Sequence, residues 1–225
     1  MKTISTFLTG LIFFILSTSV FSQDGNTSIL KINAALKNAP NNPVFLSELG
    51  RSYLKNLEYQ KAITPLEKST KLQEDNYKYH FYLSLAYGAV GRHADKLKAL
   101  QKTLKLKPDF AEANFKAGLA HAALDRHQEA SEYYRKALKS KPNNFDTQYF
   151  LALSCILSNR YKEALSAIKE SIRLNPKNAQ AHYTLGLIFM KLGNYRKAIE
   201  PLRTAIDISP NSLKHGYPNT SQKFR

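Results

Sequence analysis

Proline recurs at a fixed interval in this chain, and that interval constrains the fold more than any other feature. Pro108, Pro142, Pro176 and Pro210 lie 34 residues apart, and Glu74 holds the equivalent place one interval earlier. A period of about 34 residues is typical of stacked helical arrays, in which each copy is a pair of helices. The sequence therefore predicts an all-α fold.

The period divides most of the chain into five complete copies and a partial one. Placing the recurring proline at position 32 gives the copies 43–76, 77–110, 111–144, 145–178 and 179–212. Residues 23–42 are expected to form half a copy, a single helix that covers the front of the array. Residues 213–225 contain Gly216 and Pro218 and are expected to form an irregular tail.

Small residues recur where two helices of one copy must approach each other. Position 8 is always small: Gly50, Ser84, Gly118, Ala152 and Gly186. Position 20 is alanine in four copies, and Lys96 breaks this pattern. Glycine at position 15 closes some first helices and proline at position 32 ends the second ones. The helices are therefore expected over positions 1–14 and 17–30.

Two prolines fall inside predicted helices. Pro65 and Pro201 both occupy position 23, in the middle of a second helix. A proline in a helix interior removes a backbone donor and costs about 3 kcal/mol. We expect a local bend in both helices, which packing on either side stabilises.

The copies resemble the tetratricopeptide repeat family over nearly the whole chain after residue 22. Residues 160–165 (RYKEAL) and 193–199 (GNYRKAI) are similar to the turn between the two helices of that repeat and the start of its second helix. The resemblance implies a right-handed superhelical solenoid of stacked antiparallel helix pairs, with five full repeats and an N-terminal half repeat. It also implies a concave groove that commonly binds peptides.

The resemblance also implies a candidate binding surface, because positions 2, 5, 9 and 12 of the first helix face the groove in that family. Position 5 is aromatic and position 9 is leucine in four consecutive copies. These eight residues, the apolar ladder, are Phe81, Leu85, Phe115, Leu119, Tyr149, Leu153, Tyr183 and Leu187. A contiguous exposed apolar strip marks a docking place, so we predict that a partner's segment lies along it. The alternative is that neighbouring helices bury the strip.

The first 22 residues have the layout of a secretory signal peptide. Lys2 precedes an apolar run over residues 7–20, and Ser22 leads into a polar segment. The run is shorter than the roughly 20 residues that span a bilayer, so an uncleaved anchor is the less favoured alternative. The sequence predicts an exported protein that is periplasmic, envelope-associated or secreted.

Basic residues exceed acidic ones, with 33 Lys and Arg against 17 Asp and Glu and a net charge of +16. Many lie in the second helices, for example Lys98, Lys102, Arg135 and Lys139. These helices form most of the convex surface in the family resembled. We favour a solvated face, with docking to an anionic envelope surface as the alternative. A nucleic-acid partner is not expected, because the charge is not concentrated in the groove.

Catalytic, metal and cofactor sites are not predicted. The six histidines lack metal-ligand spacing, and the chain has neither a phosphate-binding glycine loop nor a Gly-x-Ser-x-Gly elbow. The single Cys155 occupies an apolar position and is expected to fill the core. The sequence thus predicts a non-catalytic, exported adaptor or scaffold that binds a protein or peptide in its groove. The alternative is an envelope assembly or structural factor that docks through its basic convex face.

The back of the array has no predicted covering helix. After Pro210 only the irregular tail follows, so Ile199, Leu202 and Ile206 are expected to be partly exposed. Because a stacked array needs its outer faces covered, we predict self-association or partner docking through this last copy.

Overall fold

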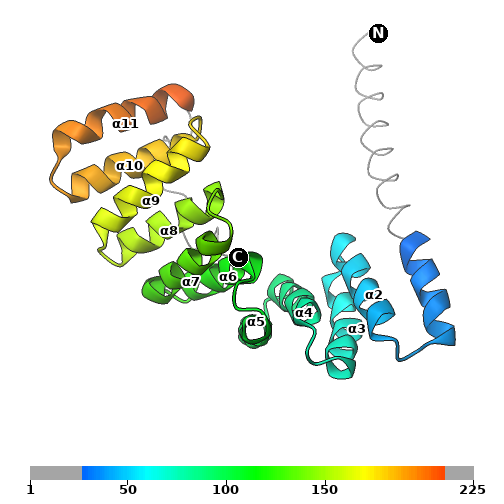
Figure 1. Ribbon diagram of the computed structural model, residues 1–225. Coiled ribbons are helices and arrows are strands. Elements are labelled where there is room, and N and C mark those ends of the chain that lie inside the picture. Colours follow the sequence, from blue (N-terminus) through cyan, green and yellow to red (C-terminus); the bar gives the residue numbers. More distant parts are fainter. Residues whose placement is uncertain (1–26, 211–225) are drawn as a thin grey trace, which may run out of the picture. The chain divides into compact units, whose positions relative to one another are not determined.

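A computed structural model describes residues 27–210 of the chain, which divides into two compact units. The first unit is Met1–Leu106 and the second is Lys107–Arg225. The predicted signal peptide (1–22) and irregular tail (213–225) lie outside the described residues. Figure 1 labels the helices of both units.

Consecutive antiparallel helices build the first unit. Residues 27–38 are helical, and α2 (Pro43–Lys55), α3 (Tyr59–Leu72), α4 (Tyr77–Ala89) and α5 (His93–Leu106) follow. Within the unit, α2 packs against α3, α3 against α4 and α4 against α5. The core between them is made by Ala62, Ile63, Leu66, Leu83, Ala86, Tyr87 and Ala99.

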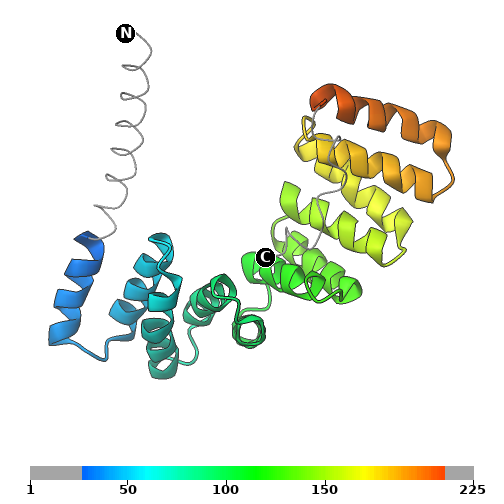
Figure 2. The same cartoon turned by 180° about the vertical axis from the view of Figure 1, so that it is seen from behind.

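The second unit repeats this arrangement over six helices. They are α6 (Ala111–Ala122), α7 (His127–Ser140), α8 (Phe145–Leu157), α9 (Tyr161–Leu174), α10 (Ala179–Lys191) and α11 (Tyr195–Ile208). Each helix packs on its successor, and Figures 1 and 2 show α8, α9, α10 and α11 stacked in chain order. Its core contains mainly small residues around a few large ones, among them Tyr134, Leu151, Ile168 and Ile188.

The predicted all-α fold of stacked helix pairs is confirmed. The described residues contain no strand, and first helices begin at residues 43, 77, 111, 145 and 179. Second helices begin at residues 59, 93, 127, 161 and 195, so both series keep the interval of 34 residues. Within residues 27–210 no helix has the length and apolar character needed to cross a membrane.

Position 8 is small because the large side chain at position 24 fills its space. A Cβ atom on Gly50 would collide with the side chain of Leu66, and one on Gly118 would collide with the ring of Tyr134. Leu66 and Tyr134 are both fully buried. The close approach predicted from the sequence is therefore a contact between a glycine on the first helix and a large residue on the second.

Lys96 departs from alanine at position 20, and a glycine on the facing helix accommodates it. A Cβ atom on Gly88 of α4 would lie 3.1 Å from Cδ of Lys96 on α5. The aliphatic part of Lys96 therefore lies against the backbone of Gly88, and the side chain is half-buried.

Position 15 has a left-handed backbone in every copy, including those without glycine. Gly91 and Gly193 have φ of 78° and 73°, as the sequence predicts. Leu57, Asp125 and Asn159 occupy the same position with φ of 62°, 56° and 59°. Leucine is rarely found there because its Cβ approaches the following carbonyl oxygen. The turn thus requires the left-handed conformation whichever residue is present.

Position 4 connects the first helix to the linker before it. Three copies place a polar side chain there, within hydrogen-bond distance of the carbonyl oxygen at position 32. The pairs are His80 with Glu74 (2.9 Å), Asn114 with Pro108 (2.8 Å) and His182 with Pro176 (2.8 Å). The two histidines therefore pair with linker carbonyls that lie beyond the preceding helix and lack an intrahelical partner.

Pro65 and Pro201 lie inside α3 and α11, as the sequence predicts. Both helices continue for a further turn or more beyond the proline. The bend expected at these positions stays a prediction.

Candidate interaction site

The apolar ladder is divided between the two units. Phe81 and Leu85 lie on α4 in the first unit, and the other six residues lie on α6, α8 and α10 in the second. Phe81 is only 3% exposed, so its ring belongs to the core and offers no face to a partner. Leu85 is half-buried.

Five of the six ladder residues in the second unit are half-buried: Phe115, Leu119, Tyr149, Tyr183 and Leu187. Leu153 is buried, with 9% of its surface exposed. Burial raises the pKa of Tyr149, and a hydrogen bond to Thr184 partly offsets this rise. The ladder is therefore neither a fully exposed strip nor a fully buried one. Most of its residues pack one side against the core and keep another side accessible.

Two aromatic residues of the ladder, Phe115 and Tyr149, pack against other aromatic rings in the second unit. The ring centroid of Phe115 lies 5.9 Å from Tyr134 and 5.8 Å from Phe150. Tyr149 packs edge-on against Phe150 at 5.9 Å. Tilted and edge-on contacts at this distance are favourable aromatic geometries. Phe115 and Tyr149 are consequently held in place before any partner arrives.

A cleft of about 210 Å³ opens beside Phe115, between the start of α6, the end of α7 and the start of α8. Its apolar wall is formed by Ala111, Phe115 and Ala137. Glu112, Lys141 and Asp146 supply charged groups, and all three are exposed. This arrangement can hold an apolar side chain and pair with charges on either side of it.

The sequence interpretation missed the two carboxylates of this cleft. Glu112 and Asp146 occupy position 2 of their copies, one of the positions that face the groove in the family resembled. Reading position 2 together with positions 5 and 9 would have identified them. Acidic residues at this place also stabilise the positive end of the helix dipole, so the signal alone does not specify binding.

A second cleft of about 510 Å³ lies where α7, α8 and α9 meet. Two ion pairs line it: Arg135 Nη1 lies 2.8 Å from Glu163 Oε1, and Arg173 Nη2 lies 2.7 Å from Glu170 Oε1. Arg135 was counted with the basic outer charges in the sequence, but its carboxylate partner neutralises much of its field. The two clefts therefore differ, because the smaller one combines charged groups with the half-buried aromatic ring of Phe115.

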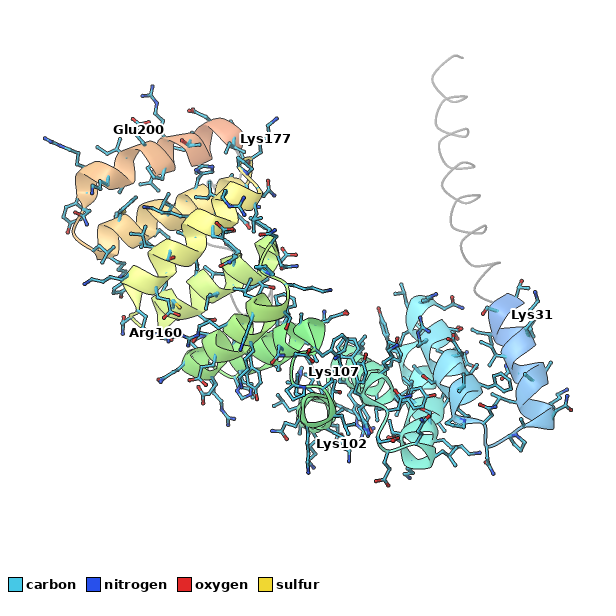
Figure 3. All side chains as sticks on the ribbon, viewed as in Figure 1. Lys31, Lys102, Lys107, Arg160, Lys177 and Glu200 are labelled. Atoms are coloured by element: carbon cyan, nitrogen blue, oxygen red, sulfur yellow. The ribbon has the colours of Figure 1, made fainter. Side chains whose placement is uncertain are left out.

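Cys155 is fully buried in the core of the second unit, as predicted. Arg160 and Glu163 lie close to it, although its sequence neighbours are uncharged. Arg160, labelled in Figure 3, also donates to Ser131 on α7. Burial raises the pKa of the thiol to about 11, so Cys155 stays protonated and unreactive at neutral pH. Among the residues the structure describes, no group of three or more His, Cys, Asp or Glu could hold a metal ion.

Comparison with known proteins identifies the family. The model of the tetratricopeptide repeat (TPR) matches residues 83–145 and 158–212, which together exceed half of the chain. The chain belongs to the tetratricopeptide repeat family. No curated protein sequence matches it.

Solved TPR structures are similar to this chain in fold. YrrB, a TPR protein with an unusual peptide-binding site, superposes with a TM-score of 0.76 at 18% identity and covers 81% of this chain and 94% of its own. The protein MamA gives a TM-score of 0.70 at 21% identity, with 77% and 95% covered. MamA from Desulfovibrio magneticus RS-1 gives 0.69 at 15% identity, with 76% and 97% covered. At these identities the likeness establishes the TPR fold and no shared ligand.

Proposed function

We propose that this TPR protein is a non-catalytic adaptor that binds a polypeptide segment along α6, α8 and α10. The observation that carries the proposal is the half-exposed part of the apolar ladder beside the cleft at Phe115. Apolar anchors of the segment would contact Phe115, Leu119 and Leu187. Its charged groups would meet Glu112, Lys141 and Asp146. The similar fold of YrrB, which has a peptide-binding site, is consistent with this use of the surface.

Photo-cross-linking tests this proposal. A photoreactive amino acid replaces Leu119, cross-links form in the native cell, and mass spectrometry identifies the captured segment. The synthetic segment is then titrated into the wild-type protein and the variant Leu119→Asp. We expect the variant to bind at least about tenfold more weakly, because a charge replaces an apolar contact.

The matched control is Leu30→Asp, which changes an exposed leucine on the helix at residues 27–38. Equal binding by wild type, Leu119→Asp and Leu187→Asp would exclude the ladder as the binding surface. Leu153 is unsuitable for this experiment, since an aspartate at a buried position would destabilise the fold itself.

Export is part of the proposal. Residues 1–22 are proposed to be a cleaved signal peptide, 23–42 a capping half repeat and 43–212 five repeats, followed by the tail. The support is the apolar run at residues 7–20 and its flanking residues. Cell fractionation and N-terminal sequencing of the mature protein test this, and a mature chain that retains Met1 in the cytoplasm would exclude export.

The alternative function is an envelope assembly or structural factor that docks to an anionic surface. Exposed lysines on the second helices favour it, namely Lys98, Lys105, Lys136 and Lys139. Co-sedimentation with anionic vesicles should then fall steeply as salt increases, whereas binding through the apolar ladder should persist. The predicted self-association through the last repeat concerns a different surface, on α11, and stays a proposal.

A further inference from the structure

Within the described residues, the side of α11 that faces away from α10 is exposed, whereas the equivalent side of α3 is covered by another helix. Position 21 holds Ile63 in α3 and Ile199 in α11; Ile63 is 5% exposed and Ile199 is 60% exposed. Position 28 shows the same contrast, with Thr70 at 7% and Ile206 at 51%. The difference arises because α4 packs against α3, whereas the described residues place only α10 against α11.

Three exposed apolar residues of α11 and the half-buried Leu202 form a stripe with coiled-coil spacing. Tyr195, Ile199, Leu202 and Ile206 follow one another at intervals of four, three and four residues. These intervals keep the residues on one side of a helix, as the a and d positions of a heptad do. We call this stripe the α11 outer face. Leu202 lies at its edge, because its side chain fills the space at Gly186.

A row of alternating charges runs beside the α11 outer face. Arg196, Glu200, Arg203 and Asp207 are spaced by the same intervals of four, three and four residues, and all four are exposed. Figure 3 shows Glu200 on the side of α11 away from α10. The charges alternate along the row, from positive at Arg196 to negative at Asp207, so its two ends carry opposite charges.

We propose that two copies of this protein associate through their α11 helices in an antiparallel, two-fold symmetric pair. A two-fold axis perpendicular to the helices brings the same flank of each helix together. Arg196 then faces Asp207 of the second copy, and Glu200 faces its Arg203. In this antiparallel arrangement every pair of flanking residues has opposite charges. Two parallel α11 helices would not bring these opposite charges together. With the charges paired in this way, Ile199 and Ile206 of each copy interdigitate across the apolar seam, and Leu202 keeps its contact with Gly186.

The proposed contact is small, and this sets its strength. One helix from each copy buries less than about 1,200 Å² in total, a size typical of weak, reversible association. We therefore expect a dissociation constant between about 10 µM and 1 mM. The contact does not involve the apolar ladder, so its failure would leave the groove proposal unaffected.

Analytical ultracentrifugation of the purified protein, from about 1 µM to 1 mM, tests association. We expect a reversible monomer–dimer equilibrium that the variant Ile199→Asp abolishes at every concentration. Leu30→Asp is the matched control, since Leu30 is 70% exposed on a different helix. Circular dichroism checks that each variant is folded. A wild-type protein that is monomeric at the highest concentration would overturn the proposal.

Charge reversal tests the antiparallel arrangement. In a symmetric dimer the contact between positions 196 and 207 occurs twice. Arg196→Glu therefore creates two glutamate–aspartate contacts, and Asp207→Arg creates two arginine–arginine contacts. Each single variant should weaken the dimer about three- to tenfold, since two pairs of like charges form. The double variant restores opposite signs and should return to within about twofold of wild type. A dimer that Ile199→Asp leaves intact, or a double variant as weak as the singles, would exclude this interface.

Discussion

The helices α3 and α11 have similar residues over their first eight positions and lie in different surroundings. Both begin with tyrosine, place isoleucine at position 21 and contain proline at position 23. In α3 the isoleucine is buried against α4, and in α11 it faces outward. An isoleucine at position 21 is therefore suited to packing against a neighbouring helix, but its presence in the sequence does not show that such a helix is there.

The largest expected effect comes from truncating that isoleucine in each helix. Ile63→Ala should lower the free energy of unfolding by about 3 kcal/mol, because the surrounding core cannot collapse into the cavity. Ile199→Ala should change the stability of the monomer by less than about 0.5 kcal/mol. Urea denaturation of both variants at low protein concentration measures the difference. Equal losses would mean that the two positions are equally buried.

A second pair of variants compares an interior contact with one in the last pair of helices. Gly118→Ala should cost about 1–3 kcal/mol, because the fully buried ring of Tyr134 has no space to move. Gly186→Ala should cost less, since Leu202 is half-buried and can shift outward. Thermal unfolding followed by circular dichroism checks the order. The reverse order would show that α11 is held as rigidly as α7.

Substitutions at position 15, in the turn between the two helices of a copy, should change the free energy of unfolding by a smaller amount. Leu57 is 70% exposed and has a left-handed backbone, so Leu57→Gly removes strain without losing packing. We expect a gain of about 0.5–1 kcal/mol in the free energy of unfolding, by chemical denaturation. The converse change in the last pair of helices, Gly193→Ala, should lose about 1 kcal/mol. A destabilised Leu57→Gly variant would contradict this account.

The smallest expected effect is a pH dependence. Burial lowers the pKa of His121 in α6, where its ring stacks on Tyr133; nearby Glu129 raises the pKa and Arg126 lowers it. A lowered pKa in the folded state favours the neutral ring. Its contribution to stability is therefore complete above the unfolded value of 6.5 and is lost as the pH falls through the folded value.

The variant His121→Phe isolates this contribution, because Phe189 occupies the same position in α10. Melting temperatures between about pH 7.5 and pH 5 should fall less for the variant than for the wild type. His80, whose pKa burial also lowers, remains in both proteins and cancels in the comparison. Parallel curves for the two proteins would exclude titration of His121 as a source of instability.

Much of the fold was predictable because its determinants are local. The recurring proline, the left-handed position 15 and the small position 8 act through the backbone and through close contacts of one helix pair. The predicted second helices start at the observed residues for this reason. Burial of Cys155 was also predictable from the ring-bearing residues at its position in other copies, Tyr53, Tyr87, His121 and Phe189.

The candidate site was less predictable. Phe81 and Phe115 hold the same position, yet one is buried and the other is half-exposed, which the repeat pattern cannot distinguish. Arg135 looks like a free surface charge in the sequence and is paired with Glu163 from a helix one copy later. Both outcomes depend on atoms from other helices.

The amino-acid sequence was sufficient for the helix pairs, their ends and their family, because short-range sterics and a repeated pattern specify each of them. Tertiary structure decided which ladder residues remain accessible, which charges are paired and that the α11 outer face is exposed. Exposure and electrostatic pairing are properties of the space around a side chain. Helices distant in the sequence fill that space or leave it open.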